Sequence, residues 1–107
     1  MARAGGLTEI QRIAALTSAH GAQLAPHAWG GAVLFASSIH FAMVLPDCHI
    51  LEATQGYVPM MWELFYAPFD IRPDGTVHAP MKPGLGFTSC ADALEKIRYV
   101  DGPEFVF

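Results

Sequence analysis

The apolar positions in the first half of the chain alternate between helical spacing and short continuous runs. Apolar residues recur on one helical face across 8–20 and Gly21 follows as a C-cap, so we expect an amphipathic helix there. Residues 30–45 are apolar nearly all round, which predicts a longer, buried helix. Short apolar runs at 23–25 and 49–52 predict strands. This alternation with short connections predicts a parallel sheet with helices packed outside it.

Two sequence motifs mark expected helix starts. Thr8 and Gln11 have the spacing of a capping box, in which the hydroxyl accepts from a backbone amide and the amide side chain reaches back. Ser89 and Asp92 repeat that spacing. We therefore expect the first helix to begin at Thr8 and a short last helix to begin at Ser89.

The second half of the chain has a different character. Residues 55–68 are rich in aromatic side chains and methionine but show no clean period, so they predict no regular element. The runs 69–72 and 76–79 flank the turn sequence at 73–75, Pro-Asp-Gly, and predict a β-hairpin. The tail, 101–107, is expected to form a turn, with a strand as an alternative.

Composition bounds the class of protein. The 107 residues correspond to one domain or part of one. They are 52% hydrophobic and 15% charged, with a mean hydropathy of +0.31. That is apolar for a small independent domain, which buries only a modest share of its surface, so we expect the chain to belong to a larger core or to an oligomer.

Charge and length exclude several kinds of partner. The net charge is −4, with six Lys and Arg residues and no basic cluster, which argues against nucleic-acid binding. The apolar run at 30–45 is shorter than the roughly 20 residues that cross a bilayer, so we expect no membrane span. Cys48 and Cys90 match no metal or redox spacing, and the N-terminus carries no secretory signature. We expect free thiols and a cytoplasmic protein.

Two residues that can do proton or electrostatic chemistry follow the two predicted strands. His27 comes after Pro26, which should end the first strand, and Glu52 ends the second. The carboxyl ends of successive parallel strands point into the same mouth of an α/β barrel, where such folds keep their active sites. A barrel of this kind typically needs roughly 250 residues, so the length raises the question of completeness.

Each candidate also has a structural interpretation. A lone histidine at a strand end is more often structural than catalytic, and Glu52 would also be stable as a solvated carboxylate. Trp29 fits either a substrate pocket or packing over the barrel mouth. His40 lies within the apolar run of the second helix, where we expect a core histidine with a satisfied hydrogen bond.

Four stretches, in order, resemble the C-terminal third of the mandelate racemase and muconate lactonizing enzymes of the enolase superfamily. They are Arg-Ala-Gly-Gly-Leu-Thr-Glu at 3–9, Ala-Pro-His at 25–27, Leu-Glu at 51–52 and Pro-Gly-Leu-Gly at 83–86. The resemblance implies an α/β fold: the last three strands' worth of a (β/α)7β barrel of the TIM type. It assigns 1–54 to the barrel segment. It assigns 55–107, with the hairpin and short helix, to a segment returning to an N-terminal capping domain, so that the chain is one incomplete domain.

The resemblance also implies chemistry. The family abstracts a proton next to a carboxylate, with Mg²⁺ stabilising the enediolate. Carried over, His27 is the catalytic acid or base and Glu52 is the catalytic partner that hydrogen-bonds the carboxylate of a sugar acid or related substrate. The 25-residue spacing and Trp29, followed by two glycines, favour the acid-sugar dehydratase-like branch over the racemases. Trp29 is the candidate substrate-binding residue.

The resemblance also implies functional residues of the family that this chain does not contain. The aspartate that orients the histidine in the family would fall one position before Met1, and the Mg²⁺ ligands belong to earlier strands. We therefore expect a C-terminal fragment that holds no metal of its own and is inactive alone, and whether the chain itself is an enzyme stays open. The alternatives are a non-catalytic interaction module that forms homo-oligomers through its apolar surface, or a truncated product without function.

Overall fold

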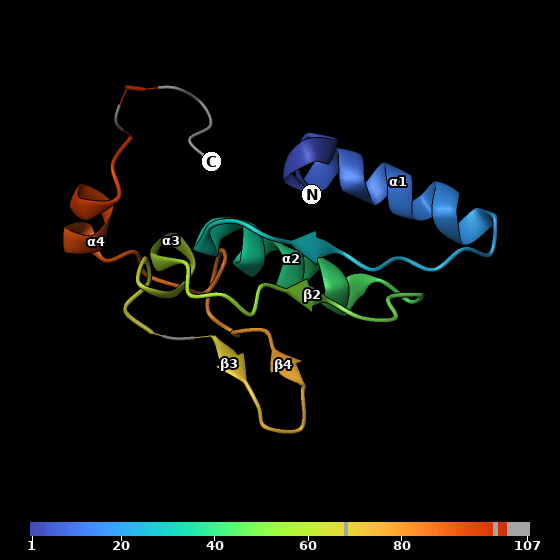
Figure 1. Cartoon of the computed structure of the whole chain (residues 1–107). Helices are drawn as coiled ribbons and strands as arrows, with labels where there is room; N and C mark the ends of the chain where they lie inside the picture. Colours follow the sequence, from blue (N-terminus) through green and yellow to red (C-terminus); the bar gives the residue numbers. More distant parts are fainter. Residues whose placement is uncertain (68, 100, 103–107) are drawn as a thin grey trace.

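The computed structural model describes residues 1–67, 69–99 and 101–102. Two 13-residue helices, α1 and α2, several shorter helices and four two-residue strands follow one another along the chain (Figure 1). The elements are a 3-10 helix η1 (Ala2–Ala4), α1 (Leu7–Ala19), β1 (His27–Ala28), α2 (Ala32–Val44), β2 (Glu52–Ala53), α3 (Pro59–Trp62), β3 (Asp70–Ile71), β4 (Val77–His78) and α4 (Ala91–Lys96). The expected tail strand falls largely on 103–107, which lie outside the described residues.

Strands β1 and β2 form a parallel pair joined by α2, which confirms the predicted strand–helix–strand unit. Their boundaries differ from the prediction, because the pairing continues past Pro26. A single parallel bridge joins Leu24 to Cys48, and the two-residue strands follow it. Proline has no N–H to donate, but its carbonyl can still accept. The Pro26 carbonyl accepts from the Glu52 amide at 3.0 Å, so Pro26 does not end the strand as predicted.

Helix α2 is the centre of the core, as its uniform apolar pattern predicts. It packs against α3 and β1, and its buried residues include Phe35 and Ile39. The Phe35 ring meets the Phe69 ring edge-on, with centroids 4.7 Å apart and planes at 82°. The cluster of buried core residues comprises Ala28, Ala32, Phe35, Ala36, Ile39, Met61, Leu64 and Phe69. The core therefore joins the β1–α2 unit to α3 and to the start of the hairpin.

Both predicted capping motifs are wrong about where the helices begin. Helix α1 starts at Leu7 with Gly6 as its N-cap, so Thr8 is already inside the helix and makes no capping hydrogen bond. The φ of Gly6 is 94°, a conformation open to glycine, and it turns the chain into the helix early. Helix α4 starts after Cys90, because Ser89 forms a β-bridge with Phe65 instead of capping.

The hairpin agrees with the prediction, and the end of α1 agrees to within one residue. Helix α1 ends at Ala19 with His20 as its C-cap, and Gly21, predicted as the C-cap, is the next residue, with a φ of 65°. Strands β3 and β4 pair antiparallel, and Gly75 in the turn has a φ of 84°. Helix α3 was not predicted, because four residues are too few to establish a period. Among the described residues, no helix is both long and apolar enough to cross a membrane.

Candidate active site

His27 and Glu52 lie side by side on neighbouring parallel strands. They are direct partners in the ladder, and His27 Nδ1 lies 2.8 Å from Glu52 Oε2. Both side chains are 58% exposed, so the pair is open to solvent. The structure therefore brings together the two residues that the sequence singled out.

The alternation of side chains along β1 explains why this pair faces outward. Successive residues of a strand point to opposite faces, and in-register residues of neighbouring strands share a face. Ala28, the residue after His27, is buried in the core with Ala32 and Phe35 of α2. Helix α2 thus covers one face of the strand pair, and His27 and Glu52 occupy the other.

Trp29 lies next to the pair and is largely exposed. Its ring centroid is 6.2 Å from that of His27, with the planes tilted by 37°, and the residue is 68% exposed. The chain then enters α2 through Gly31, where a Cβ would come within 2.9 Å of Met60 Sδ. Within the described part of the chain, Trp29 is thus an apolar surface beside His27 and not a packed core residue.

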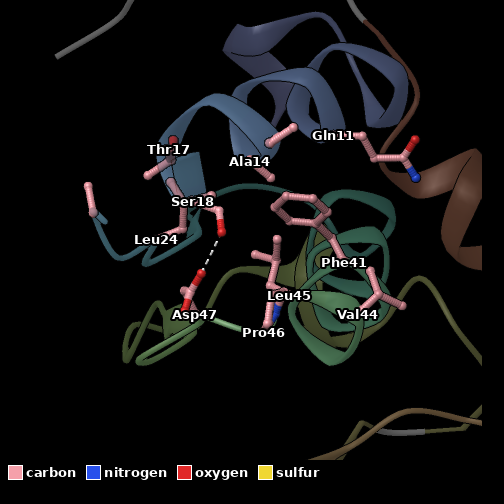
Figure 2. A pocket seen from close by; sticks show the side chains of 12 residues that line it. Gln11, Ala14, Thr17, Ser18, Leu24, Phe41, Val44, Leu45, Pro46 and Asp47 are labelled. Atoms are coloured by element: carbon pink, nitrogen blue, oxygen red, sulfur yellow. Dashed lines mark hydrogen bonds between the residues drawn. The ribbon is translucent and has the colours of Figure 1, made fainter. Parts of the chain in front are cut away.

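The apolar groove between α1 and α2 is a separate feature (Figure 2). It has a volume of about 380 Å³, and Ser18 donates to Asp47 across it at 2.9 Å. Leu24 and Asp47 lie where the paired segments begin, whereas His27 and Glu52 lie where they end. Barrel enzymes keep catalytic residues at the carboxyl ends of strands, so the groove is not the candidate site. Its lining residues are Gln11, Ala14, Ala15, Thr17, Ser18, Ala22, Leu24, Phe41, Val44, Leu45, Pro46 and Asp47.

The described residues do not fit a magnesium site. Mg²⁺ requires a near-octahedral set of oxygen ligands. Across 1–67, 69–99 and 101–102, no three His, Cys, Asp or Glu residues come close enough together to hold a metal ion. The candidate pair offers a single carboxylate, that of Glu52, and its neighbour His27 offers nitrogen in place of the oxygen that Mg²⁺ prefers.

Two observations complete the comparison with the sequence. His40 Nε2 lies 3.0 Å from the Leu85 carbonyl oxygen, which confirms the expected hydrogen bond. His40 is half-buried and lies at the edge of the core, so the prediction of a core histidine is wrong on that point. The direct contact between His27 and Glu52 was not predicted, because the resemblance paired His27 with an aspartate. The only sequence signal for this contact was the spacing of 25 residues across a strand–helix–strand unit. Spacing alone does not set which residues of two strands lie opposite each other.

Comparisons with known proteins identify the family of the chain. A sequence model of the family described as "Enolase C-terminal domain-like" matches residues 1–93. The D-galactarolactone cycloisomerase of Agrobacterium fabrum (strain C58) is 34% identical over 105 residues, covering 91% of this chain and 28% of that protein. The D-galactonate dehydratase of Verminephrobacter eiseniae is 34% identical over 110 residues, covering 98% of this chain and 28% of that protein.

A solved structure shares the fold of this chain. The mandelate racemase/muconate lactonizing enzyme from Jannaschia sp. CCS1 superposes with a TM-score of 0.81 and 36% identity, covering 94% of this chain and 25% of that one. The chain thus spans about a quarter of the length of the proteins it matches. Its β1–α2–β2 unit is a piece of a TIM-barrel-type fold. With residues 1–93 matched, the chain belongs to the enolase C-terminal domain-like family.

Proposed function

We propose that this chain supplies the His–Glu part of the active site of an enolase-superfamily enzyme that acts on a sugar acid, by dehydration or racemisation. The observation that carries the proposal is the in-register pair of His27 and Glu52, 2.8 Å apart at the carboxyl ends of parallel strands. The names of the relatives support the substrate class, since they include a galactonate dehydratase and a galactarolactone cycloisomerase.

In this proposal each site residue has one chemical task. His27 moves the proton at the carbon next to the substrate carboxylate, because an imidazole titrates near neutral pH and serves as acid or base. Glu52 hydrogen-bonds the substrate carboxylate. Trp29 supports an apolar wall of the substrate pocket, since its exposed ring lies beside His27. The 58% exposure of the pair leaves room for a substrate to reach both side chains.

The proposal also states which parts of the enzyme this chain would supply and which would come from the rest of the protein. Residues 1–54 form the barrel segment, and 55–107 form the return segment, together one incomplete domain. The described residues do not fit Mg²⁺, so the metal that the family uses would be held by other strands of the barrel. The isolated chain is accordingly expected to be inactive. Its two free thiols, Cys48 and Cys90, support a cytoplasmic location.

A chimera tests the catalytic assignment. Residues 1–93 would replace the matching segment of the D-galactonate dehydratase of Verminephrobacter eiseniae, and dehydration of galactonate would be followed with Mg²⁺ present. We expect turnover in the chimera and a loss of at least 100-fold in kcat in its His27→Asn variant, since general acid–base catalysis contributes typically 10²–10⁴-fold.

The matched control is His49→Asn, which changes an exposed histidine outside the pair and should leave kcat within about twofold. A folded chimera without turnover contradicts the proposal, as does an active His27→Asn variant. Turnover by the isolated 107-residue chain would show instead that this chain is catalytically complete.

A second candidate function rests on the apolar surface. Leu16, Val44 and Ile50 are each more than half exposed, and a parallel sheet normally has its faces and edges covered. A module that assembles into a homo-oligomer would cover such side chains. Size-exclusion chromatography with light scattering separates the two functions, because a stable monomer at high concentration contradicts the assembly module.

A further inference from the structure

We propose that Gln55 is a specificity-determining residue of the candidate site: its side-chain amide hydrogen-bonds a hydroxyl group of the sugar acid, on the part of the substrate away from the carboxylate. This inference rests on the proposed function, in which Glu52 binds the substrate carboxylate. It names a contact by which the site would distinguish a polyhydroxy acid from a short hydroxy acid.

The first step concerns the place of Gln55 in the fold. Strand β2 ends at Ala53, and Gln55 follows Glu52 by three residues. Three residues span at most about 11 Å of chain, so Gln55 lies in the segment directly beyond the carboxyl end of the strand. The active sites of barrel enzymes are built from the loops at this end. Gln55 is exposed, so a ligand can reach it.

The second step concerns what holds this segment in place. The Gly56 backbone N–H donates to Thr54 Oγ1 at 3.3 Å, and Thr54 is only 7% exposed. From α3, the Trp62 indole N–H donates to the Gly56 carbonyl, also at 3.3 Å. The Trp62 ring in turn meets the ring of the core residue Phe35, with centroids 6.5 Å apart. The turn is therefore connected to the core on both sides of Gln55.

The third step concerns which polar groups of the segment remain available to a ligand. Thr54 Oγ1 and the Gly56 carbonyl take part in the hydrogen bonds just described. The Tyr57 hydroxyl donates to the Glu63 carboxylate. Among residues 1–67, 69–99 and 101–102, the Gln55 amide has no hydrogen-bond partner. A side-chain amide has two donor hydrogens and an acceptor oxygen, so it can bind a hydroxyl group in either role.

The fourth step concerns the kind of ligand. With its carboxylate at Glu52, a sugar acid extends away from it as a chain of carbon atoms that carry hydroxyl groups. Met60 of α3 lies against Gly31, two residues after Trp29, where a Cβ would come within 2.9 Å of Met60 Sδ. Helix α3 thus contacts both the segment that follows Trp29 and the turn that carries Gln55. The site then combines an apolar ring with one free amide, which suits a chain of carbon atoms bearing hydroxyl groups.

Ligand binding to the chimera described above tests the inference. Its His27→Asn variant, with Mg²⁺ present, allows affinity to be measured by titration calorimetry without turnover. Galactonate is the polyhydroxy probe, and lactate, which has no hydroxyl group beyond carbon 2, is the short probe. Adding Gln55→Leu should weaken galactonate binding about 3–10-fold, the usual effect of losing one hydrogen bond between neutral groups. Lactate binding should stay within about twofold, because lactate has no group for the amide to bind.

The comparison of the two acids separates a substrate contact from a general structural effect. Gln23→Leu is the matched control, because Gln23 is an exposed glutamine next to Leu24, where the paired segments begin. It should change the affinity for neither acid by more than about twofold. Equal weakening of both acids by Gln55→Leu, or unchanged galactonate binding, would overturn the inference. If Gln55→Leu fails to fold, Gln55→Ala replaces it under the same criteria.

The outcome is separable from that of the proposed function. Affinity is read in a variant without turnover, whereas the proposed function is read as turnover in the chimera itself. An active chimera whose galactonate affinity does not depend on Gln55 leaves the function and overturns this inference. A chimera with a Gln55-dependent affinity but no turnover does the reverse. A chimera that binds no galactonate overturns both.

Discussion

Phe35 is the core residue whose removal should destabilise the fold most. It is 1% exposed on α2, and its ring meets the rings of Phe69 and Trp62 edge-on at 4.7 and 6.5 Å between centroids. These contacts connect α2 to α3 and to the start of the hairpin. Phe35→Ala would remove the ring from the place where three segments meet.

The size of the effect follows from burial. Replacing a core phenylalanine by alanine costs about 3–5 kcal/mol, through lost transfer free energy and the cavity left behind. A domain of this size is stable by about 5–15 kcal/mol, so the variant should lose a large fraction of its free energy of unfolding. Leu16→Ala is the matched control: Leu16 is 65% exposed on α1, and its loss should cost no more than about 0.5 kcal/mol.

Urea unfolding, followed by far-UV circular dichroism and tryptophan fluorescence, measures both variants. With a slope near 2 kcal/mol per molar urea, the midpoint should fall by about 2 M in Phe35→Ala and by less than about 0.3 M in Leu16→Ala. A fall below about 0.5 M in Phe35→Ala, at an unchanged slope, would refute the conclusion that the fold depends on this aromatic contact. Equal shifts in the two variants would refute it as well.

Two further predictions concern the hairpin and the segment after it. Gly86→Ala should lower the free energy of unfolding in urea by about 2 kcal/mol or more, because φ is +77° and the new Cβ would overlap the Pro80 ring. Gly75→Ala is the control: its φ is +84° but the space around it is open, so it should cost only about 1 kcal/mol. Equal losses in the two variants would contradict the role of the Pro80 ring. The pKa of Asp74 is held below its ordinary value of 3.8 by hydrogen bonds, the largest from the Thr76 backbone N–H. Its folded pKa is thus below its unfolded pKa, so this stabilisation of the turn is present above about pH 4 and is lost as the pH falls through the folded pKa. A carboxyl titration by NMR at or above 3.8 for Asp74 would contradict it.

The strongest local signals in the sequence were also the most reliable. The apolar run of α2 predicts a buried helix, and the turn at 73–75 combines Pro, Asp and Gly in a sequence that favours a hairpin. The hairpin is confirmed, and so is the helix, but α2 is buried on one side only, since Val33, Met43 and Val44 are more than half exposed. The helix starts were predicted less well, because a residue with a capping side chain can instead pair in a β-bridge or lie inside a helix that begins earlier. Ser89 is held in a bridge with Phe65, and Gly6 turns the chain before Thr8 can cap.

The amino-acid pattern was enough to select His27 and Glu52 as candidates and to predict the two strands that carry them. His27 and Glu52 each follow a short apolar run, and a helix of the right length separates them, so parallel strands were the expected outcome. The contact between the two side chains follows from the strand register, which depends on packing. A shift of one residue in the ladder would move Glu52 to the opposite face, and register depends on the packing of Ala28 against α2 and on the acceptor at Pro26. These are contacts between residues far apart in the chain, which no local pattern encodes.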